Sequence, residues 1–172
     1  MKKMTTLIMT ALIGLGGSAM ALTEGDPVPN IKVASTSGQD VSLADFKGSW
    51  LVVYFYPKSF TPGCTKEACS LRDGYAEIEA TGATLLGVSL DDLETQHKFR
   101  KDYQLPFNLL ADTSKELSRS MGALMVGGFM TKRMTFIINP EGTIAKVLTS
   151  VTVSDHDSEV LAALKELQAK DA

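Results

Sequence analysis

Residues 50–69 read WLVVYFYPKSFTPGCTKEAC, an apolar run followed at once by a turn-forming loop and a charged segment. The run from Trp50 to Tyr56 is continuous, rich in β-branched and aromatic side chains, and stopped by Pro57. Strands that are covered on both faces of a sheet have this composition, because neither face meets water. We therefore predict that this run is a strand in the centre of a sheet.

A helix with one apolar face is predicted after the loop. Apolar side chains recur there at steps of three and four residues, with charged side chains between them, which is the period of an amphipathic helix. We expect this helix from Cys64 to about Ala80. Its apolar positions are Ala68, Leu71, Tyr75 and Ile78.

The rest of the chain alternates between strand and helix patterns. Residues 22–48 contain Pro and Ser and are expected to form an irregular, extended lead-in. The order of the later elements predicts an α/β fold with a mixed central sheet flanked by helices, and a thioredoxin-like fold fits this order. The expected strands are 84–89, 108–111, 134–139 and 143–148, and the expected helices are 92–103, 114–121 and 157–169.

The first residues have the pattern of a cleavable export signal. Lys2 and Lys3 precede an uncharged apolar run, and Ala19-Met20-Ala21 offers small residues at both positions that signal peptidase reads. The run is shorter than the ~20 residues that cross a bilayer, so we expect no stable membrane association. We therefore divide the chain into a signal peptide, residues 1–21, and one domain, residues 22–172, located in the periplasm or outside the cell.

Charge and length restrict the partners of this domain. Residues 1–21 contain two lysines and no acidic residue, so their removal changes the formal charge from −3 to −5. A mildly acidic surface argues against nucleic acid as a partner. We expect a monomer that uses no cofactor and no metal.

Cys64 and Cys69 are the only two cysteines. In a secreted protein such a pair is most often a structural disulfide. On one helix, however, their Cα atoms would lie about 8 to 9 Å apart on different faces. A disulfide requires less than ~7 Å. The first helical turn would therefore have to unwind, and the spacing indicates a redox switch.

The surroundings of Cys64 favour a reactive thiolate. The preceding residues Thr61-Pro62-Gly63 place it in the first helical turn, where unpaired N–H groups and the positive end of the helix dipole stabilise a negative charge. A second thiol nearby can convert an oxidised cysteine into a disulfide. The hydroxyl of Thr61 has two possible roles, which are to cap the helix or to hydrogen-bond a sulfur or a hydroperoxide.

Pro57, Thr61 and Cys64 match the P-x-x-x-T-x-x-C active-site motif of peroxiredoxins, and FYPKSFTPGCTKEACSLRD resembles the bacterioferritin-comigratory (PrxQ-type) branch. The resemblance covers about residues 25–167. It implies a thiol-dependent peroxidase that reduces hydrogen peroxide and organic hydroperoxides, with Cys64 as the peroxidatic cysteine. In that branch the resolving cysteine follows five residues later on the same helix, which is the position of Cys69.

The resemblance also implies a role for Arg133 and the partners of the protein. The family uses an arginine just before a late strand to stabilise the thiolate and polarise the peroxide, and Arg133 precedes the apolar run 134–138. The implied partners are a hydroperoxide substrate and a thioredoxin-like or other thiol reductant. Many members of the branch are cytoplasmic, so an exported chain needs a reductant outside the cytoplasm.

Two alternative functions fit the sequence less well. A secreted thiol-disulfide oxidoreductase of thioredoxin type would need C-x-x-C and a proline directly before the strand at Met134, and the chain has neither. A copper-binding chaperone on the same fold would need soft ligands such as Cys with His. The two histidines, His97 and His156, stand among charged residues without ligand spacing to the cysteines, so we expect both at the solvated surface.

The mature chain is predicted to begin at Leu22, because signal peptidase cleaves after a sequence such as Ala19-Met20-Ala21. Intact-mass spectrometry of exported protein should give the mass of residues 22–172. Exported protein that retained Met1 would contradict this assignment.

Overall fold

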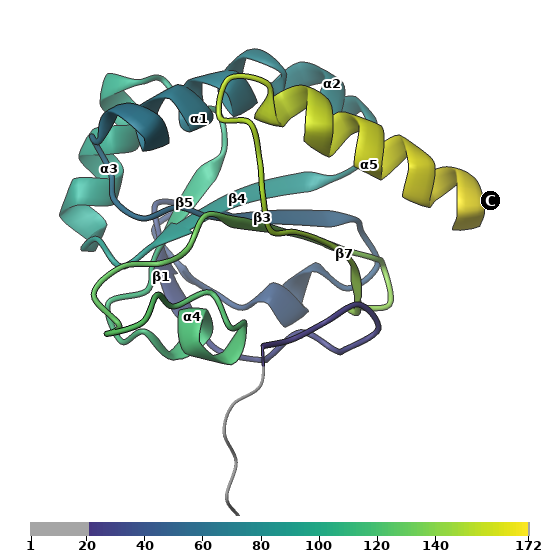
Figure 1. Cartoon of the computed structure of the whole chain (residues 1–172), viewed down its shortest axis with the longest axis horizontal. Coiled ribbons are helices and arrows are strands. Elements are labelled where there is room, and N and C mark those ends of the chain that lie inside the picture. Colours follow the sequence, from purple (N-terminus) through teal and green to yellow (C-terminus); the bar gives the residue numbers. More distant parts are fainter. Residues whose placement is uncertain (1–20, 172) are drawn as a thin grey trace, which may run out of the picture.

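The computed structural model describes residues 21–171 and contains a seven-stranded mixed sheet with helices on both faces (Figure 1). The strand order is β2-β1-β5-β4-β3-β6-β7. The predicted central strand is confirmed as β3 (Leu51–Phe55), and all of its residues are buried. It pairs in parallel with β4 (Thr84–Ser89) and in antiparallel fashion with β6 (Met134–Ile138). The α/β prediction is therefore confirmed.

The lead-in is more regular than predicted. It contributes β1 (Val33–Ser35) and β2 (Asp40–Val41), which form an antiparallel pair, and the 3-10 helix η1 (Leu43–Phe46). Strand β1 also pairs with β5 (Asn108–Ala111). Without this pairing, one edge of β5 would present unpaired backbone groups, which is the physical reason for the difference. At the other edge of the sheet, β7 (Ile144–Leu148) pairs with β6.

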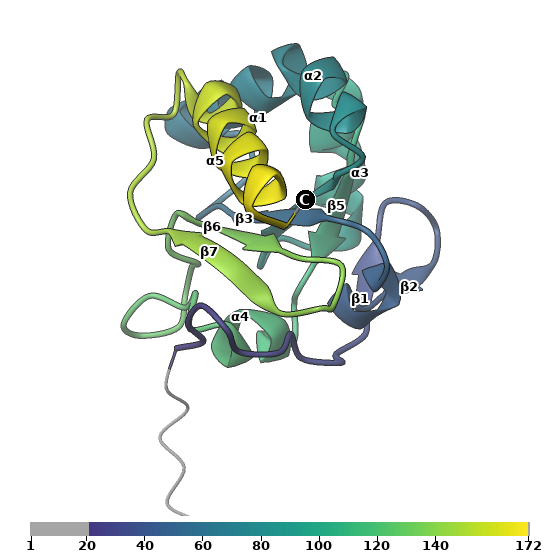
Figure 2. The ribbon, with the colours of Figure 1, turned by 90° about the vertical axis from the view of Figure 1, so that its right-hand side faces the viewer.

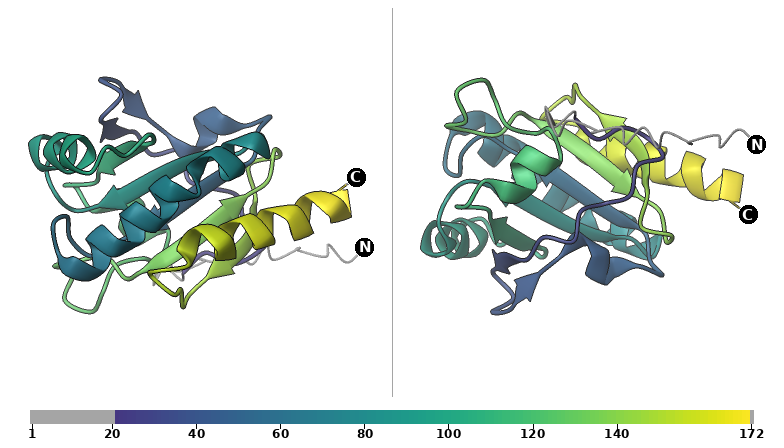
Figure 3. Two further views of the ribbon diagram at one scale, coloured as in Figure 1. Left: turned by 90° about the horizontal axis from the view of Figure 1, so that it is seen from above. Right: turned by 90° about the horizontal axis from the view of Figure 1, so that it is seen from below.

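Helices cover the two faces unequally. On one face lie α1 (Pro62–Asp73), α2 (Tyr75–Ala80), α3 (Leu93–Asp102) and α5 (His156–Asp171), whereas α4 (Glu116–Ser120) and the lead-in cover the other (Figure 2). Seen from above, α5 runs beside α1 and α2 (Figure 3). The face of the sheet that α1 covers therefore carries the larger share of the helices.

The single helix predicted from Cys64 to Ala80 is divided at Gly74. A Cβ atom at Gly74 would lie 2.5 Å from the Cβ of Asp157, near the start of α5. Only glycine leaves room for this close approach, and the helical periodicity contains no sign of it. The break therefore results from packing between α1 and α5.

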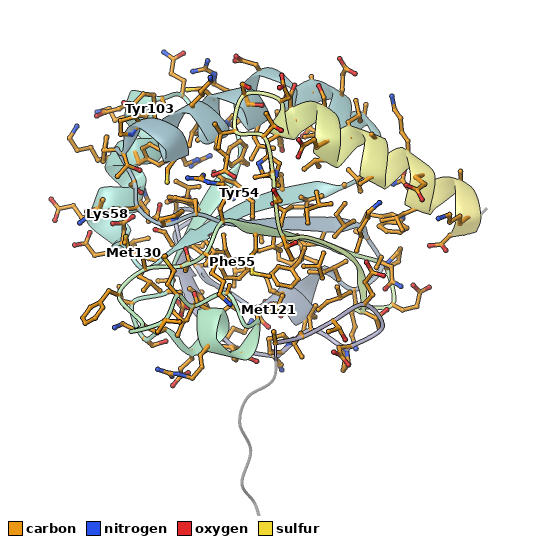
Figure 4. The ribbon with its side chains drawn as sticks, in the orientation of Figure 1. Tyr54, Phe55, Lys58, Tyr103, Met121 and Met130 are labelled. Carbon is orange, nitrogen blue, oxygen red and sulfur yellow. The ribbon has the colours of Figure 1, made fainter. Side chains whose placement is uncertain are left out.

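Two apolar cores follow from the alternation of side chains along β3. Tyr54 points toward α1 and α5, and its neighbour Phe55 points toward α4 (Figure 4). The first core also contains Cys64, Ala68 and Leu71, all from α1. The apolar face of α1 therefore packs directly against the centre of the sheet.

The predicted signal peptide, residues 1–21, lies outside the described residues except for Ala21, and its boundary stays a prediction. Among the helices of residues 21–171, none combines the length and the apolar character that a membrane crossing requires.

Candidate active site

Cys64 lies in the first turn of α1, as predicted. Thr61 is the N-cap residue and Pro62 occupies the first helical position, where its missing N–H costs nothing. The Cys64 side chain is 2 % exposed. The sulfur is therefore shielded from bulk water beside backbone N–H groups that favour negative charge.

The loop between β3 and α1 is anchored from three sides. The Tyr56 carbonyl accepts a hydrogen bond of 2.6 Å from the Thr131 hydroxyl, and the Ser59 N–H donates one of 2.8 Å to Asp91. Phe60 has a φ of 66°, an uncommon conformation for an aromatic residue, and its ring packs 5.1 Å from that of Phe99 on α3. These contacts determine the position at which α1 begins.

Arg133 contacts the sulfur directly. Its Nη2 lies 3.5 Å from Sγ of Cys64, and its Nη1 forms an ion pair with Glu67, the third residue after Cys64. The residue reaches this place because β6 pairs with β3 in the register that sets Met134 opposite Phe55. The pairing brings the residue before β6 to the end of β3 from which α1 departs.

The charge on Arg133 is secured by its neighbours. Burial opposes this charge, but the Glu67 carboxylate and the Cys64 sulfur outweigh it and raise the pKa of the guanidinium above its ordinary value. Arg133 is 24 % exposed at its side chain. A permanently charged cation at the sulfur stabilises the thiolate and any negative charge that develops in a reaction there.

Thr61 does not cap the helix with its side chain. Its hydroxyl donates a hydrogen bond of 2.8 Å to the Lys58 carbonyl, so its proton is engaged and its lone pairs are available. Of the roles predicted for Thr61, this geometry favours accepting a hydrogen bond from a hydroperoxide.

Cys69 is not brought to Cys64. Both cysteines are free, both belong to α1, and Cys69 is only partly buried. Five helical positions rotate the two side chains to different faces. The predicted conflict between an intact helix and a disulfide is therefore present in the structure.

Two buried polar side chains near the sulfur, Glu67 and His156, are not predicted by the sequence. Glu67 lies among the charged residues that separate the apolar positions of the predicted helix, yet it is completely buried. The spacing in the sequence could have revealed that Glu67 is near the sulfur, because a residue three positions after Cys64 lies on the same helix face.

The prediction that His156 lies at the surface is wrong. Its side chain is fully buried at the first position of α5, with Nε2 2.9 Å from the Thr135 hydroxyl and Nδ1 3.1 Å from Oε1 of Glu67. Packing of α5 against α1 causes the burial, and the neighbouring charges in the sequence conceal it. His97 is exposed on α3, as predicted.

A pocket of about 480 Å³ adjoins the arginine. Pro57 forms part of its wall, so this motif residue and Arg133 line the same pocket. Lys58 and Met130 lie at the same end of the molecule and line a neighbouring hollow (Figure 4). The lining of the larger pocket consists of Pro57, Met125, Thr131, Lys132, Arg133, Met134 and Thr149.

Comparison with known families agrees with this geometry. The model of the AhpC/TSA family matches residues 24–147. The chain belongs to the AhpC/TSA family. It is 36 % identical over 157 residues to Peroxiredoxin Bcp of Bacillus subtilis, covering 88 % of this chain and all of that protein. It is 37 % identical over 151 residues to Peroxiredoxin Bcp of Escherichia coli, covering 84 % of this chain and 97 % of that protein.

The chain is also similar to a solved structure of the bacterioferritin comigratory protein of Xanthomonas campestris. That structure is described in connection with the alkyl peroxide reduction activity of the Xanthomonas protein. It superposes with a TM-score of 0.76 at 30 % identity, covering 84 % of this chain and 98 % of that one. The thioredoxin-like peroxiredoxin fold is thereby confirmed, and so is membership in the Bcp branch of thiol-dependent peroxidases. Neither alternative function is favoured by these relatives.

Replacing Arg133 with alanine is predicted to slow the reaction of Cys64 with hydrogen peroxide by about 100-fold. The loss of one donor that stabilises developing negative charge typically costs a factor of ~10² to 10³. Stopped-flow measurement of the second-order rate constant checks this. Arg133→Lys is the control, because it keeps the positive charge but loses the planar guanidinium that contacts Glu67 and the sulfur together. Its rate constant should lie between those of the wild type and Arg133→Ala. An unchanged rate in Arg133→Ala would show that the guanidinium does not act on the sulfur.

Proposed function

We propose that this peroxiredoxin reduces hydrogen peroxide and organic hydroperoxides with Cys64 as the peroxidatic cysteine and Cys69 as the resolving cysteine. The proposal is carried by the position of the Cys64 sulfur, which is buried in the first turn of α1 and lies 3.5 Å from Nη2 of Arg133. A helix terminus and a guanidinium stabilise a thiolate from two directions.

The first step transfers one oxygen atom to sulfur. The Cys64 thiolate attacks the terminal oxygen of the hydroperoxide, the O–O bond breaks, and the sulfur becomes a sulfenic acid. The leaving oxygen departs as alkoxide or hydroxide and takes a proton from water. Arg133 stabilises the charge as it moves from sulfur to oxygen, and Thr61 accepts the hydrogen bond of the hydroperoxide O–H.

The second step requires part of α1 to open. The Cys69 sulfur attacks the sulfenic sulfur of Cys64, an S–S bond forms, and water leaves. Because both cysteines stand on α1, the helix between them must unwind before the sulfurs meet. A dithiol reductant then returns both cysteines to thiols by exchange.

The pocket beside Arg133 supports organic hydroperoxides as substrates. Met125, Met134 and Pro57 provide apolar walls next to the guanidinium, so an alkyl chain can lie there while its peroxide group reaches the sulfur. The activity for which the Xanthomonas relative is described supports the same substrate class.

We further propose that the enzyme acts in the periplasm or outside the cell as a monomer. The export pattern of residues 1–21 supports the location. In an oxidising compartment Cys64 and Cys69 need continuous reduction, so the reductant is a thioredoxin-like or other thiol protein of that compartment.

Oxidation is predicted to increase amide exchange across residues 63–71 while β3 stays protected. The opened turn loses its backbone hydrogen bonds, and terminal turns open at low cost. Hydrogen-exchange mass spectrometry of the reduced and peroxide-oxidised protein measures the difference. Cys64→Ser is the control, because without its thiolate it should neither consume peroxide nor change its exchange.

Cys69→Ser completes this test. It should react once with peroxide, stop at the sulfenic acid and over-oxidise readily. Equal exchange across residues 63–71 in both redox states, or normal cycling of Cys69→Ser with a dithiol reductant, would refute the intrahelical switch.

Met125→Ser is predicted to slow reduction of cumene hydroperoxide about 5-fold, because one apolar contact with the substrate is lost. The rate with hydrogen peroxide should stay within about 2-fold, since that substrate has no chain to bind. Phe129→Ser is the matched control, as Phe129 is an exposed apolar residue of the same loop that does not line this pocket. Equal loss with both peroxides would place the organic substrate elsewhere.

A further inference from the structure

A continuous line of polar side chains runs from the start of α5 to the sulfur of Cys64. His156 lies 2.9 Å from the Thr135 hydroxyl through Nε2 and 3.1 Å from Oε1 of Glu67 through Nδ1. The other carboxylate oxygen of Glu67 pairs with Nη1 of Arg133, whose Nη2 is 3.5 Å from the sulfur. Thr135, His156 and Glu67 are all fully buried. The mechanism above uses neither His156 nor Thr135.

Nδ1 of His156 and Oε1 of Glu67 lie 3.1 Å apart, and within residues 21–171 neither atom has a partner in hydrogen-bond geometry. A buried carboxylate oxygen without a donor is strongly unfavourable, and an ionised carboxylate can only accept. The proton therefore belongs on Nδ1. Nε2 then lies 2.9 Å from the Thr135 hydroxyl, which can donate to it.

The ring is positioned independently of the peroxide. The residue after His156 is Asp157, whose carboxylate accepts a hydrogen bond of 2.7 Å from the Ser70 hydroxyl on α1. The close approach at Gly74 holds the same part of α5 against α1. Tyr54 on β3 packs edge-on against the ring with 6.1 Å between centroids. These three contacts hold the ring of His156 beside Glu67.

We propose that His156 is a positioning residue of the peroxidase reaction. Its Nδ1–H holds Oε1 of Glu67, which fixes the plane of the carboxylate and keeps Oε2 on Arg133. The guanidinium is then held with Nη2 toward the sulfur. Without this contact the Glu67 carboxylate can rotate, and the partly exposed Arg133 loses its fixed orientation. The inference rests on the proposed role of Cys64 as peroxidatic cysteine.

Two isosteric variants separate the two ring nitrogens. Asparagine places its amide nitrogen near the position of Nδ1, and glutamine places its amide near that of Nε2. His156→Gln should therefore lower the second-order rate constant for hydrogen peroxide about 10-fold, since misplacing a catalytic group by about 1 Å costs up to ~100-fold. His156→Asn keeps a donor for Glu67 and should remain within about 3-fold of the wild type. Equal losses in both variants would overturn the proposal.

The Arg133→Ala background tests the route of the effect. If His156 acts through Glu67 and Arg133, His156→Gln should change the remaining rate by less than about 2-fold when Arg133 is absent. A loss of about 10-fold in that background as well would show a general structural role and overturn the proposal.

A measurement on the unaltered protein decides the matter even if a variant fails to fold. The ¹⁵N shifts of the His156 ring report which nitrogen carries a proton, and a protonated Nδ1 is expected. A bare Nδ1 would set two lone pairs against each other and overturn the proposal. This readout does not depend on turnover, whereas retained peroxide turnover by Cys64→Ser would refute the proposed function itself. The two failures are therefore distinguishable.

Discussion

The ion pair between the buried Glu67 and the partly exposed Arg133 is the interaction on which the arrangement of the site depends. Glu67 is carried by α1 and Arg133 by the segment before β6, so their pairing joins the helix that holds the sulfur to the neighbour of the central strand. A fully buried carboxylate tolerates its charge only with such a partner. Because the guanidinium has a second terminal nitrogen, Nη2, the same pairing also directs positive charge at the Cys64 sulfur.

This constraint opposes the chemistry that follows it. Glu67 lies between Cys64 and Cys69, in the part of α1 that has to unwind before the sulfurs meet. In the proposed reaction, the contacts that hold Arg133 at the Cys64 sulfur therefore stabilise the reduced conformation against a disulfide between Cys64 and Cys69. A short disulfide loop adds little entropic stabilisation of its own. In the proposed cycle, the reduced helix is thus the state to which exchange with a thiol reductant returns the protein.

The site also depends on segments that are distant along the chain. The loop after β3 receives one hydrogen bond from Thr131 and donates one to Asp91, while the start of α5 places His156 behind Glu67. Close packing of α1 against both the sheet and α5 makes these distant residues part of one rigid surrounding for Cys64.

The sequence by itself determined the features that are local. The apolar run of β3, the loop that begins at Pro57 and the first turn of α1 follow one another within residues 50–69, so composition and spacing were enough to predict them. The motif from Pro57 to Cys69 indicated the chemistry for the same reason. Arg133 lay far outside this stretch and was assigned only through its position before a strand in a related family.

Only the tertiary structure decided the burial of charged and polar groups. Glu67 and His156 stand among charged neighbours in the sequence, as residues of a solvated surface do. Their burial results from the packing of α5 against α1, which no local pattern encodes. The break at Gly74 and the pairing of β1 with β5 have the same origin. Periodicity reports which face of an element is apolar, but a buried polar residue is tolerated only when a distant partner satisfies it, and that partner is brought there by the fold.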